Sequence, residues 1–486
     1  MSAALYESWV RASGGTRPIR RILVANNGMA AAKFILSIRN WLFETFGDEH
    51  LIHIIAMATP EDMKASAKHL HLADAYYEVP GGPNFNNYAN VSVITSMAKL
   101  HRADAVWPGW GHASENPALP RTCEELGILF IGPSESSMFL LGDKIASTII
   151  AQSASVPCVS WSGSGVSVSP DENGQVSVSD EIFAQACVNS AEEAVTVAER
   201  VGYPVMIKAS EGGGGKGVRK ATCVEQIETM YQQVTDEVKG SPVFLMRLCS
   251  SARHVEIQLL TDKHTNVCVL SGRDCSMQRR FQKIVEEGPP TAVSPSTMRE
   301  MELAAARLAR MVNYTHAGTV EYLFIEETGE FFFLELNPRL QVEHPVTEGI
   351  TGTNLPALQL MVCMGCDLTR LPADTNVAPF IVNCNEPSPA NPFSKVRARW
   401  ASTVAMVAVA WGGGGGEADT GPIQDPIQNR SHAHAPSLHP GERPRDRRAH
   451  HGGERRGRLE ANGGVNLDDR VSIAAKGGWK GGWKGG

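Results

Sequence analysis

Short apolar runs alternate with longer helix-like stretches over the first part of the chain. RILVANNG, HIIAMATPED and ADAVWPGWG each contain an apolar run and end in a polar or glycine-containing turn. Apolar segments with helical spacing lie between them. This alternation is typical of a parallel α/β domain, in which ligands contact the loops at the carboxyl ends of the strands. We therefore expect a Rossmann-like domain over residues 1–143.

The pattern changes in the next part of the chain. Residues 144–246 predict a smaller α/β unit, and RHVEIQLLTD and NVCVLSGRDCSMQ predict strands of a larger sheet within residues 247–371. TVEYLFIEETGEFFFLELN predicts two strands joined by a turn at Glu326–Glu330, with Gly329 in the turn. Residues 296–314 predict a helix with one apolar face, formed by Met301, Ala304, Ala305, Leu308, Met311 and Val312.

The composition changes again near residue 372. WGGGGGEADTGP and GERPRDRRAHHGGERRGRLE have almost no apolar periodicity, so we expect residues 401–486 to be mostly disordered. The arginines of this tail could bind RNA weakly, as Gly/Arg-rich segments do. A translated frameshift or a mis-spliced end explains the tail at least as well.

Composition and charge narrow the class of protein. The chain has 486 residues, a net charge of -7 and 42% hydrophobic residues, which is typical of a soluble protein with two or three domains. This charge indicates no nucleic-acid or membrane-surface partner. No apolar run approaches the ~18 residues of a membrane span, and the N-terminus lacks the apolar segment of a secretory signal. The ten cysteines are scattered, which fits reduced thiols, and we interpret Cys363 and Cys366 as structural rather than redox-active or zinc-binding.

Acidic side chains in the expected hairpin predict a metal site. If the hairpin folds about Thr328, Glu321 lies directly across from Glu335, and Asn337 shares the face of Glu335. Two carboxylates so placed would be ~5 Å apart and would repel each other. A divalent cation such as Mg²⁺ resolves this conflict, because it prefers oxygen ligands and can also bind substrate phosphates. The alternative is that Glu321 faces solvent on an edge strand.

The segment after this hairpin carries candidate catalytic groups. Arg339 can hold a planar oxyanion by two parallel hydrogen bonds. Glu343 beside such an anion is a candidate general base. A purely structural Arg–Glu pair is the alternative.

The segment IKASEGGGGKGVRK predicts a mobile phosphate-binding loop. It is not the common P-loop, because Lys216 is followed by Gly217 rather than by Ser or Thr. Free backbone N–H groups can wrap phosphates, while Lys208 and Lys216 supply positive charge. Four adjacent glycines favour a flap that orders over a nucleotide, although they also fit a flexible surface turn.

These segments together resemble a known enzyme family. GDK, YPVMIKASEGGGGKG, RHVEIQ, RDCSMQRRFQKIVEE and FLELNPRLQVEHPVTE are similar to the biotin carboxylase component of biotin-dependent carboxylases, which has an ATP-grasp fold. TPEDMKASAKHLHLADAYYEVPGGPNFNNYANV, AVWPGWGHASENP and VSWSGSG resemble the eukaryotic, multidomain acetyl-CoA carboxylases in particular. The resemblance extends from about Arg17 to Leu371, so the chain looks C-terminally truncated or frameshifted.

The resemblance implies a domain organisation and a reaction. It implies a pre-ATP-grasp domain (1–143), an ATP-grasp lid (144–246), a catalytic, metal-binding subdomain (247–371) and a degenerate remnant of the C-terminal subdomain (372–400) before the tail. ATP would phosphorylate bicarbonate to carboxyphosphate, which decomposes to CO₂ and phosphate beside biotin, and the biotin would then capture the CO₂. This is the first half-reaction of malonyl-CoA formation.

The resemblance also assigns residues by position. Around the nucleotide it places Lys144, Lys208, Gly212, Gly213, Gly214, Gly215, Lys216, Gly217, Met246, Arg247, Cys249, His254, Gln278, Glu321 and Glu335. Two Mg²⁺ or Mn²⁺ ions would be held by Glu321, Glu335 and Asn337. Lys283, Arg339 and Val342 would surround bicarbonate. Arg339, Glu343 and Lys283 would be catalytic, with Glu343 as the base.

Two departures from the family pattern leave a second hypothesis open. Phe281 stands where the family usually has His, and residues 372–400 match the completing subdomain weakly, with Arg397 or Arg399 as candidates for its biotin-side arginine. The biotin-carrier motif is absent, so a carrier would have to act in trans. The alternative is therefore a non-catalytic, ATP-binding remnant of the domain. The resemblance further implies a cytoplasmic enzyme, with a plastid location not excluded, and allows a homodimer as in the full-length family.

Overall fold

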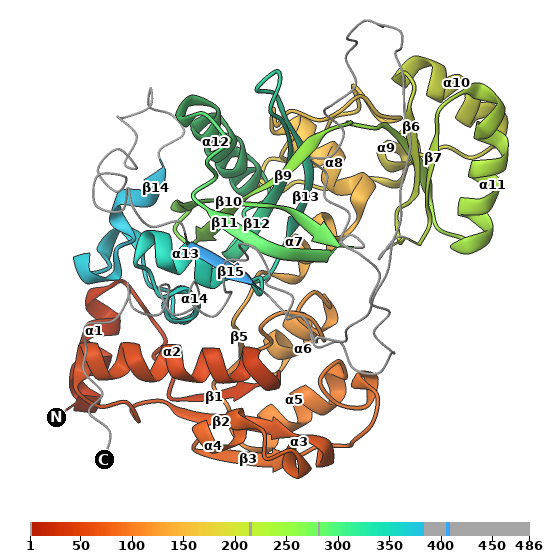
Figure 1. Ribbon diagram of the computed structural model, residues 1–486. Coiled ribbons are helices and arrows are strands. Elements are labelled where there is room, and N and C mark those ends of the chain that lie inside the picture. The colour runs from red at the N-terminus through yellow and green to blue at the C-terminus, as the bar shows by residue number, and fades with distance from the viewer. Residues whose placement is uncertain (1, 213–215, 280–281, 383–404, 409–486) are drawn as a thin grey trace, which may run out of the picture. The chain divides into compact units, whose positions relative to one another are not determined.

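The computed structural model describes residues 2–212, 216–279, 282–382 and 405–408. These residues lie in one compact unit, Met1–Val409. The second unit, Ala410–Gly486, is outside the described residues. Three sheets are present in the described part of the chain (Figure 1).

The N-terminal sheet is parallel, as the alternating pattern predicts. Its strand order is β3-β2-β1-β4-β5, so the order reverses between β1 and β4. The strands are β1 (Arg21–Val24), β2 (His53–Ala58), β3 (Ala75–Glu78), β4 (Ala105–Trp107) and β5 (Leu129–Phe130). The helices of this part are α1 (Ser2–Ala12), α2 (Gly28–Phe46), α3 (Pro60–Lys64), α4 (Lys68–Leu72), α5 (Val91–Leu100) and α6 (Ala118–Glu125), with a 3₁₀ turn η1 (Asn84–Asn86).

A small antiparallel sheet carries the glycine-rich segment. Its order is β7-β6-β8, with β6 (Val205–Ala209), β7 (Val218–Ala221) and β8 (Val243–Arg247). The glycine-rich segment connects β6 to β7. Helices α10 (Ala191–Val201) and α11 (Ile227–Glu237) pack against this sheet, as Figure 1 shows. The remaining elements of this part are α7 (Glu135–Gly142), α8 (Lys144–Ser153), α9 (Asp180–Ala184) and η2 (Val224–Gln226).

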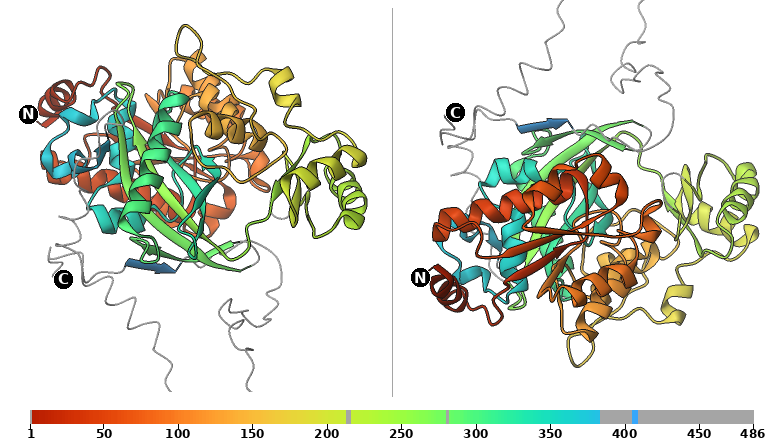
Figure 2. Two further views of the ribbon diagram at one scale, coloured as in Figure 1. Left: turned by 90° about the horizontal axis from the view of Figure 1, so that it is seen from above. Right: turned by 90° about the horizontal axis from the view of Figure 1, so that it is seen from below.

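A larger antiparallel sheet forms the centre of the unit. Its order is β13-β12-β9-β10-β11-β15, and β14 pairs with β10. The strands are β9 (Ala252–Thr261), β10 (Val267–Arg279), β11 (Gln282–Gly288), β12 (His316–Ile325), β13 (Phe331–Asn337), β14 (Ile381–Val382) and β15 (Ala405–Ala408). Helix α12 (Pro295–Met311) packs against β9 and β10, α13 (His344–Thr351) against β10 and β11, and α14 (Leu355–Cys363) against β12 (Figure 2).

The predicted hairpin and helix are confirmed. Strand β12 ends at Ile325 and β13 begins at Phe331, with Gly329 at a φ of 74° in the turn between them. Helix α12 begins after Ser294, whose hydroxyl accepts a hydrogen bond from Thr297 N. Five of the six predicted apolar positions are buried, and Met311, the last residue of the helix, is half-buried.

The chain is ordered beyond the point where the composition changes. Residues 373–375 (η4) and 378–380 (η5) form 3₁₀ turns, and Val377 and Phe380 are buried in the apolar core that also contains residues of α2 and α14. Within the range predicted to be mostly disordered, Ala405–Ala408 instead pairs with β11 as an antiparallel strand. Its sequence, AMVA, is a short apolar run that fits a sheet edge. Arg397, Arg399 and the arginine-rich tail lie outside the described residues.

The structure also bears on the two cysteines of the C-x-x-C segment and on membrane-spanning helices. Cys363 and Cys366 are free and buried, in agreement with a structural role. Among the described residues, no helix has both the length and the apolar character needed to cross a membrane.

Candidate active site

Four charged residues form one row across the large sheet. Arg273 on β10 pairs in register with Glu256 on β9, Glu256 pairs with Glu321 on β12, and Glu321 pairs with Glu335 on β13. The hairpin register predicted for Glu321 and Glu335 is therefore confirmed. Three carboxylates on neighbouring strands repel one another, so the row needs compensating positive charge.

Lys283, on β11, supplies charge at the centre of this arrangement. Its Nζ donates to Glu256 Oε2 (2.5 Å), Glu343 Oε1 (2.7 Å) and Glu321 Oε1 (2.8 Å). Burial alone would lower the pKa of Lys283, but the three carboxylates raise it above its usual value. Lys283 thus stays charged and links three elements, β9, β12 and the start of α13.

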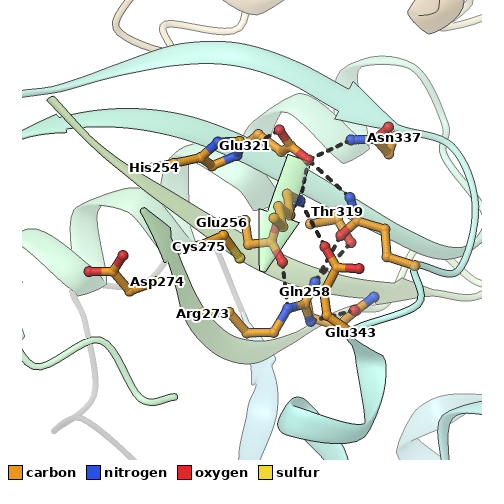
Figure 3. Close-up of polar contacts among 12 residues, drawn as sticks. His254, Glu256, Gln258, Arg273, Asp274, Cys275, Thr319, Glu321, Asn337 and Glu343 are labelled. Atoms are coloured by element: carbon orange, nitrogen blue, oxygen red, sulfur yellow. Dashed lines mark hydrogen bonds and ion pairs between the residues drawn. The ribbon is translucent and has the colours of Figure 1, made fainter. Parts of the chain in front are cut away.

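Glu321 is held from several sides (Figure 3). Its Oε1 also accepts hydrogen bonds from Asn337 Nδ2 (2.9 Å) and Gln341 Nε2 (3.0 Å), and its Oε2 lies 2.7 Å from His254 Nε2. Burial would raise the pKa of Glu321, yet the hydrogen bond with His254 and the charge of Lys283 lower it. Glu321 is therefore an anionic oxygen donor in a nearly closed site.

The base of the cluster is an ion pair with no exposed surface. Arg273 Nε lies 2.5 Å from Glu256 Oε1, and both side chains are 0% exposed. The Arg273 guanidinium also donates to Gln258 Oε1 (2.9 Å), Thr347 Oγ1 (2.6 Å) and Gln341 Oε1 (2.9 Å). These bonds fix Gln341, which in turn donates to Glu321. Arg273 therefore acts on the site through the residues that it holds.

Glu335 lies at the other end of the row, beside two lysines. Burial and the neighbouring Glu321 carboxylate raise the pKa of Glu335, while Lys144 and Lys283 oppose this shift. The pKa of Lys208 is lowered to about 8, mainly by burial and also by the charge of Lys144, while the charge of Glu335 opposes this shift. The lysines at the glycine-rich segment and the carboxylate row therefore share one electrostatic environment.

The donor set fits a hard divalent cation. Glu321 and Glu335 face each other on adjacent strands, and the Asn337 amide lies beside them. Carboxylate and amide oxygens are the ligands that Mg²⁺ and Mn²⁺ prefer. The raised pKa of Glu335 shows that a neighbouring positive charge would stabilise its anion. A second group, His254, Glu256 and Glu321, also brings its ligand atoms within 4.8 Å of one another.

Arg339 lies at the edge of the cluster and reaches the N-terminal part. Its Nε is 3.1 Å from Glu115 Oε1, and its Nη2 donates to Asn337 Oδ1 (3.3 Å). Glu343, the predicted base, contacts Lys283 rather than Arg339. Arg339, Lys283 and Glu343 thus border the carboxylate row.

The remaining predicted site residues make fewer contacts with the charged cluster or lie apart from it. Gln278 Nε2 and His254 Nδ1 are 2.9 Å apart, which places Gln278 beside the cluster. Met246 and Arg247 lie on β8, with Met246 buried and Arg247 exposed, and Cys249 follows half-buried. Val342 is half-buried next to Glu343. Gly212, Lys216 and Gly217 lie at the two stems of the glycine-rich segment, whereas Gly213, Gly214, Gly215 and Phe281 are outside the described residues.

Sequence reasoning missed Glu256 and Arg273, and it gave no role to Gln341, although Gln341 lies in the same segment as Arg339 and Glu343. A signal for Glu256 was present, because His254, Glu256 and Gln258 stand at every second position of the strand and the residues between them, Val255 and Ile257, are apolar. Arg273 carries no comparable signal, since its role depends on the pairing of β9 with β10.

The fold and the site define a class. A parallel N-terminal sheet is followed by a small lid-like sheet with a glycine-rich segment and two lysines, and then by an antiparallel sheet with paired acidic residues. This combination defines an ATP-grasp enzyme, a class in which a nucleotide lies between two antiparallel sheets.

Comparisons with known proteins define the family. Residues 18–138 match the family model "Biotin carboxylase, N-terminal domain", and residues 176–371 match "Carbamoyl-phosphate synthase L chain, ATP binding domain". Biotin carboxylase from Campylobacter jejuni, solved with a β,γ-ATP compound, has a TM-score of 0.64 and 30% identity, over 74% of this chain and 73% of that one. The chain therefore belongs to the biotin carboxylase family.

Further relatives agree with this assignment. The biotin carboxylase domain of Hydrogenobacter thermophilus 2-oxoglutarate carboxylase, solved with MgADP, ADP and bicarbonate, has a TM-score of 0.61 and 32% identity, over 72% of this chain and 70% of that one. Acetyl-CoA carboxylase 1 of Arabidopsis thaliana is 57% identical over 366 residues, and acetyl-CoA carboxylase of Saccharomyces cerevisiae is 53% identical over 367. Each match covers 75% of this chain but 16% of the relative, so the matching part corresponds to the biotin carboxylase region of a much longer protein.

Proposed function

We propose that the chain carboxylates biotin on a separate carrier, using ATP and bicarbonate, as the first half-reaction of acetyl-CoA carboxylase. The observation that carries this proposal is the row Arg273–Glu256–Glu321–Glu335, with Lys283 at its centre. The MgADP and bicarbonate bound by the Hydrogenobacter thermophilus domain support it.

The nucleotide lies between the two antiparallel sheets in this proposal. Lys144 and Lys208 neutralise its phosphates, and backbone N–H groups of the glycine-rich segment surround them. Glu321, Glu335 and Asn337 hold two Mg²⁺ or Mn²⁺ ions, which neutralise charge on the phosphates when bound. The adenine contacts the backbone of Met246–Cys249, and His254 and Gln278 lie beside the nucleotide.

Bicarbonate is the first nucleophile. Arg339 orients it by paired hydrogen bonds, while Lys283 and the backbone at Val342 border it. Glu343 accepts the bicarbonate proton as a carbonate oxygen bonds to the γ-phosphorus and the bond to the bridging β,γ-oxygen breaks. The products of this step are carboxyphosphate and ADP.

The carboxyl group then passes to biotin. Cleavage of the carbon–oxygen bond of carboxyphosphate gives CO₂ and phosphate, and the phosphate accepts the proton of the ureido nitrogen. That nitrogen bonds to the CO₂ carbon and forms carboxybiotin. A carrier domain presents the biotin to this site.

The test measures bicarbonate-dependent release of ADP by the purified chain, with and without free biotin. We expect release that requires Mg²⁺ and bicarbonate and that falls at least about 100-fold in Glu335→Gln. ATP binding without bicarbonate-dependent turnover would instead support a non-catalytic, ATP-binding remnant.

A further inference from the structure

One carboxylate joins helix α8 to the glycine-rich segment. Asp143 precedes α8, and its Oδ1 accepts hydrogen bonds from Ile145 N and Ala146 N, both at 2.8 Å. Its other oxygen, Oδ2, accepts a hydrogen bond from Ser210 Oγ at 2.6 Å. Ser210 follows the last residue of β6 and is 3% exposed. We call the Asp143–Ser210 hydrogen bond the clasp.

The clasp lies between two candidate phosphate-binding lysines. Lys144 is the next residue after Asp143, and its Nζ donates to Ser210 O (2.9 Å) and Gly212 O (2.6 Å). Lys208 lies on β6, two residues before Ser210. Both lysine backbones are therefore fixed to the same partly buried hydrogen bond, one on each side.

The rest of this stem is also held in place. Ser210 N donates to Pro242 O (2.8 Å), and Glu211 N donates to Ser241 Oγ (3.0 Å). These bonds connect the stem only to the segment before β8. Among the described residues, the clasp and the Lys144 hydrogen bonds connect the stem to α8, which packs against β13.

Two ammonium groups close together repel each other, and the charge of Lys144 lowers the pKa of Lys208. A chain of phosphates between them would relieve this repulsion, provided that both lysines keep their spacing. A hydrogen bond to a charged group is stronger than a neutral one and suits this positioning task.

We propose that Asp143 and Ser210 are positioning residues for the nucleotide. The clasp sets the spacing of Lys144 and Lys208, so that both ammonium groups contact one triphosphate chain. This inference rests on the proposed function, because it assumes that the two lysines bind ATP.

The test compares three variants with the wild-type chain. Ser210→Ala removes the clasp, while Asp143→Asn retains it, because the amide oxygen can still cap α8 and the amide N–H can donate to Ser210 Oγ. Ser241→Ala is the matched control, since Ser241 is 8% exposed and holds the same stem without touching α8. The measurements are the equilibrium Kd for MgATP, the KM values for ATP and bicarbonate, and the melting temperature.

We expect Ser210→Ala to weaken MgATP binding about tenfold and to raise the KM for ATP equally, with the KM for bicarbonate unchanged. Ser241→Ala should stay within about twofold of wild type in MgATP binding, and Asp143→Asn, in which the clasp is a neutral hydrogen bond, should weaken binding by less than Ser210→Ala does. Equal ATP affinity in Ser210→Ala and wild type would overturn the inference while leaving the proposed function intact. A wild-type chain that does not bind MgATP would overturn both.

Discussion

Arg273 and Glu256 are paired in register on neighbouring strands and form an ion pair with neither side chain exposed. Burial would raise the pKa of Glu256, and the charges of Arg273 and Lys283 lower it instead. Each partner therefore depends on the other for its charge in a region that excludes water. The pair ends the row of carboxylates and supports Gln341, which donates a hydrogen bond to Glu321.

Removing Arg273 should destabilise the protein strongly. Arg273→Met leaves Glu256 buried with one cation fewer, and we expect a loss of about 3–5 kcal/mol in the free energy of unfolding. Urea denaturation followed by circular dichroism measures it. Arg121→Met is the control, because Arg121 and Glu135 are 54% and 41% exposed, and it should cost about 1 kcal/mol or less. A similar loss of unfolding free energy in both variants would show that burial does not increase the cost of breaking the Arg273–Glu256 pair.

Glu335→Gln should separate stability from metal binding. The substitution removes a negative charge next to Glu321, so at neutral pH the protein without ligand should be unchanged or more stable by about 1 kcal/mol. The same variant should lose the increase in melting temperature that MgATP gives the wild type. A scan of melting temperature with and without MgATP measures both effects. Full retention of the MgATP shift would show that Glu335 does not help to hold the metal.

ATP affinity should fall as the pH rises through the pKa of Lys208. The pKa of Lys208 is lowered to about 8, mainly by burial. The ammonium form therefore predominates at pH 7 and is lost as the pH rises above the pKa. Phosphates bind the ammonium form, so binding at higher pH must also take up a proton. The Kd for MgATP should therefore increase about tenfold per pH unit above the pKa.

Lys208→Arg is the control for this pH dependence. Arginine remains charged throughout the range, so the dependence that belongs to residue 208 should disappear in this variant. An identical pH profile in both proteins would assign the titration to another group.

Local patterns predicted the hairpin of β12 and β13, because the side-chain alternation and the turn residues lie within one short segment. The register of Glu321 and Glu335 follows from that segment alone. The roles of Glu256 and Lys283 instead depend on strands β9 and β11 meeting the hairpin, and the partner of Arg339, Glu115, comes from the N-terminal part. Such contacts follow from tertiary pairing, which a single sequence does not encode locally.

The end of the folded region carries little sequence signal. Within the range predicted to be a degenerate remnant, Val377, Phe380 and Val382 are buried, the last on β14. Ala405–Ala408 was included in the tail, yet it extends the large sheet at β11. Both segments are too short to show a clear period, so only their partners in the sheet and the core reveal them.

Arg339 should affect bicarbonate chemistry rather than stability. Its contact with Glu115, which is 47% exposed, contributes little to folding. Arg339→Ala should therefore reduce bicarbonate-dependent turnover by about 100-fold or more, with the Kd for MgATP unchanged. Arg339→Lys should recover little of this loss, because lysine cannot form two parallel hydrogen bonds. Recovery of wild-type turnover by lysine would show that charge alone suffices.

The most direct test follows the carbon atom. The purified chain is incubated with MgATP, ¹⁴C-bicarbonate and biotin, and acid-labile ¹⁴C in biotin is measured after rapid separation. The acidic row with Lys283 at its centre predicts labelled carboxybiotin in the wild type, formed only with MgATP, and none above background in Glu335→Gln. If the wild type forms no labelled carboxybiotin, or if the wild type and Glu335→Gln form equal amounts, the proposed role of the acidic row is contradicted.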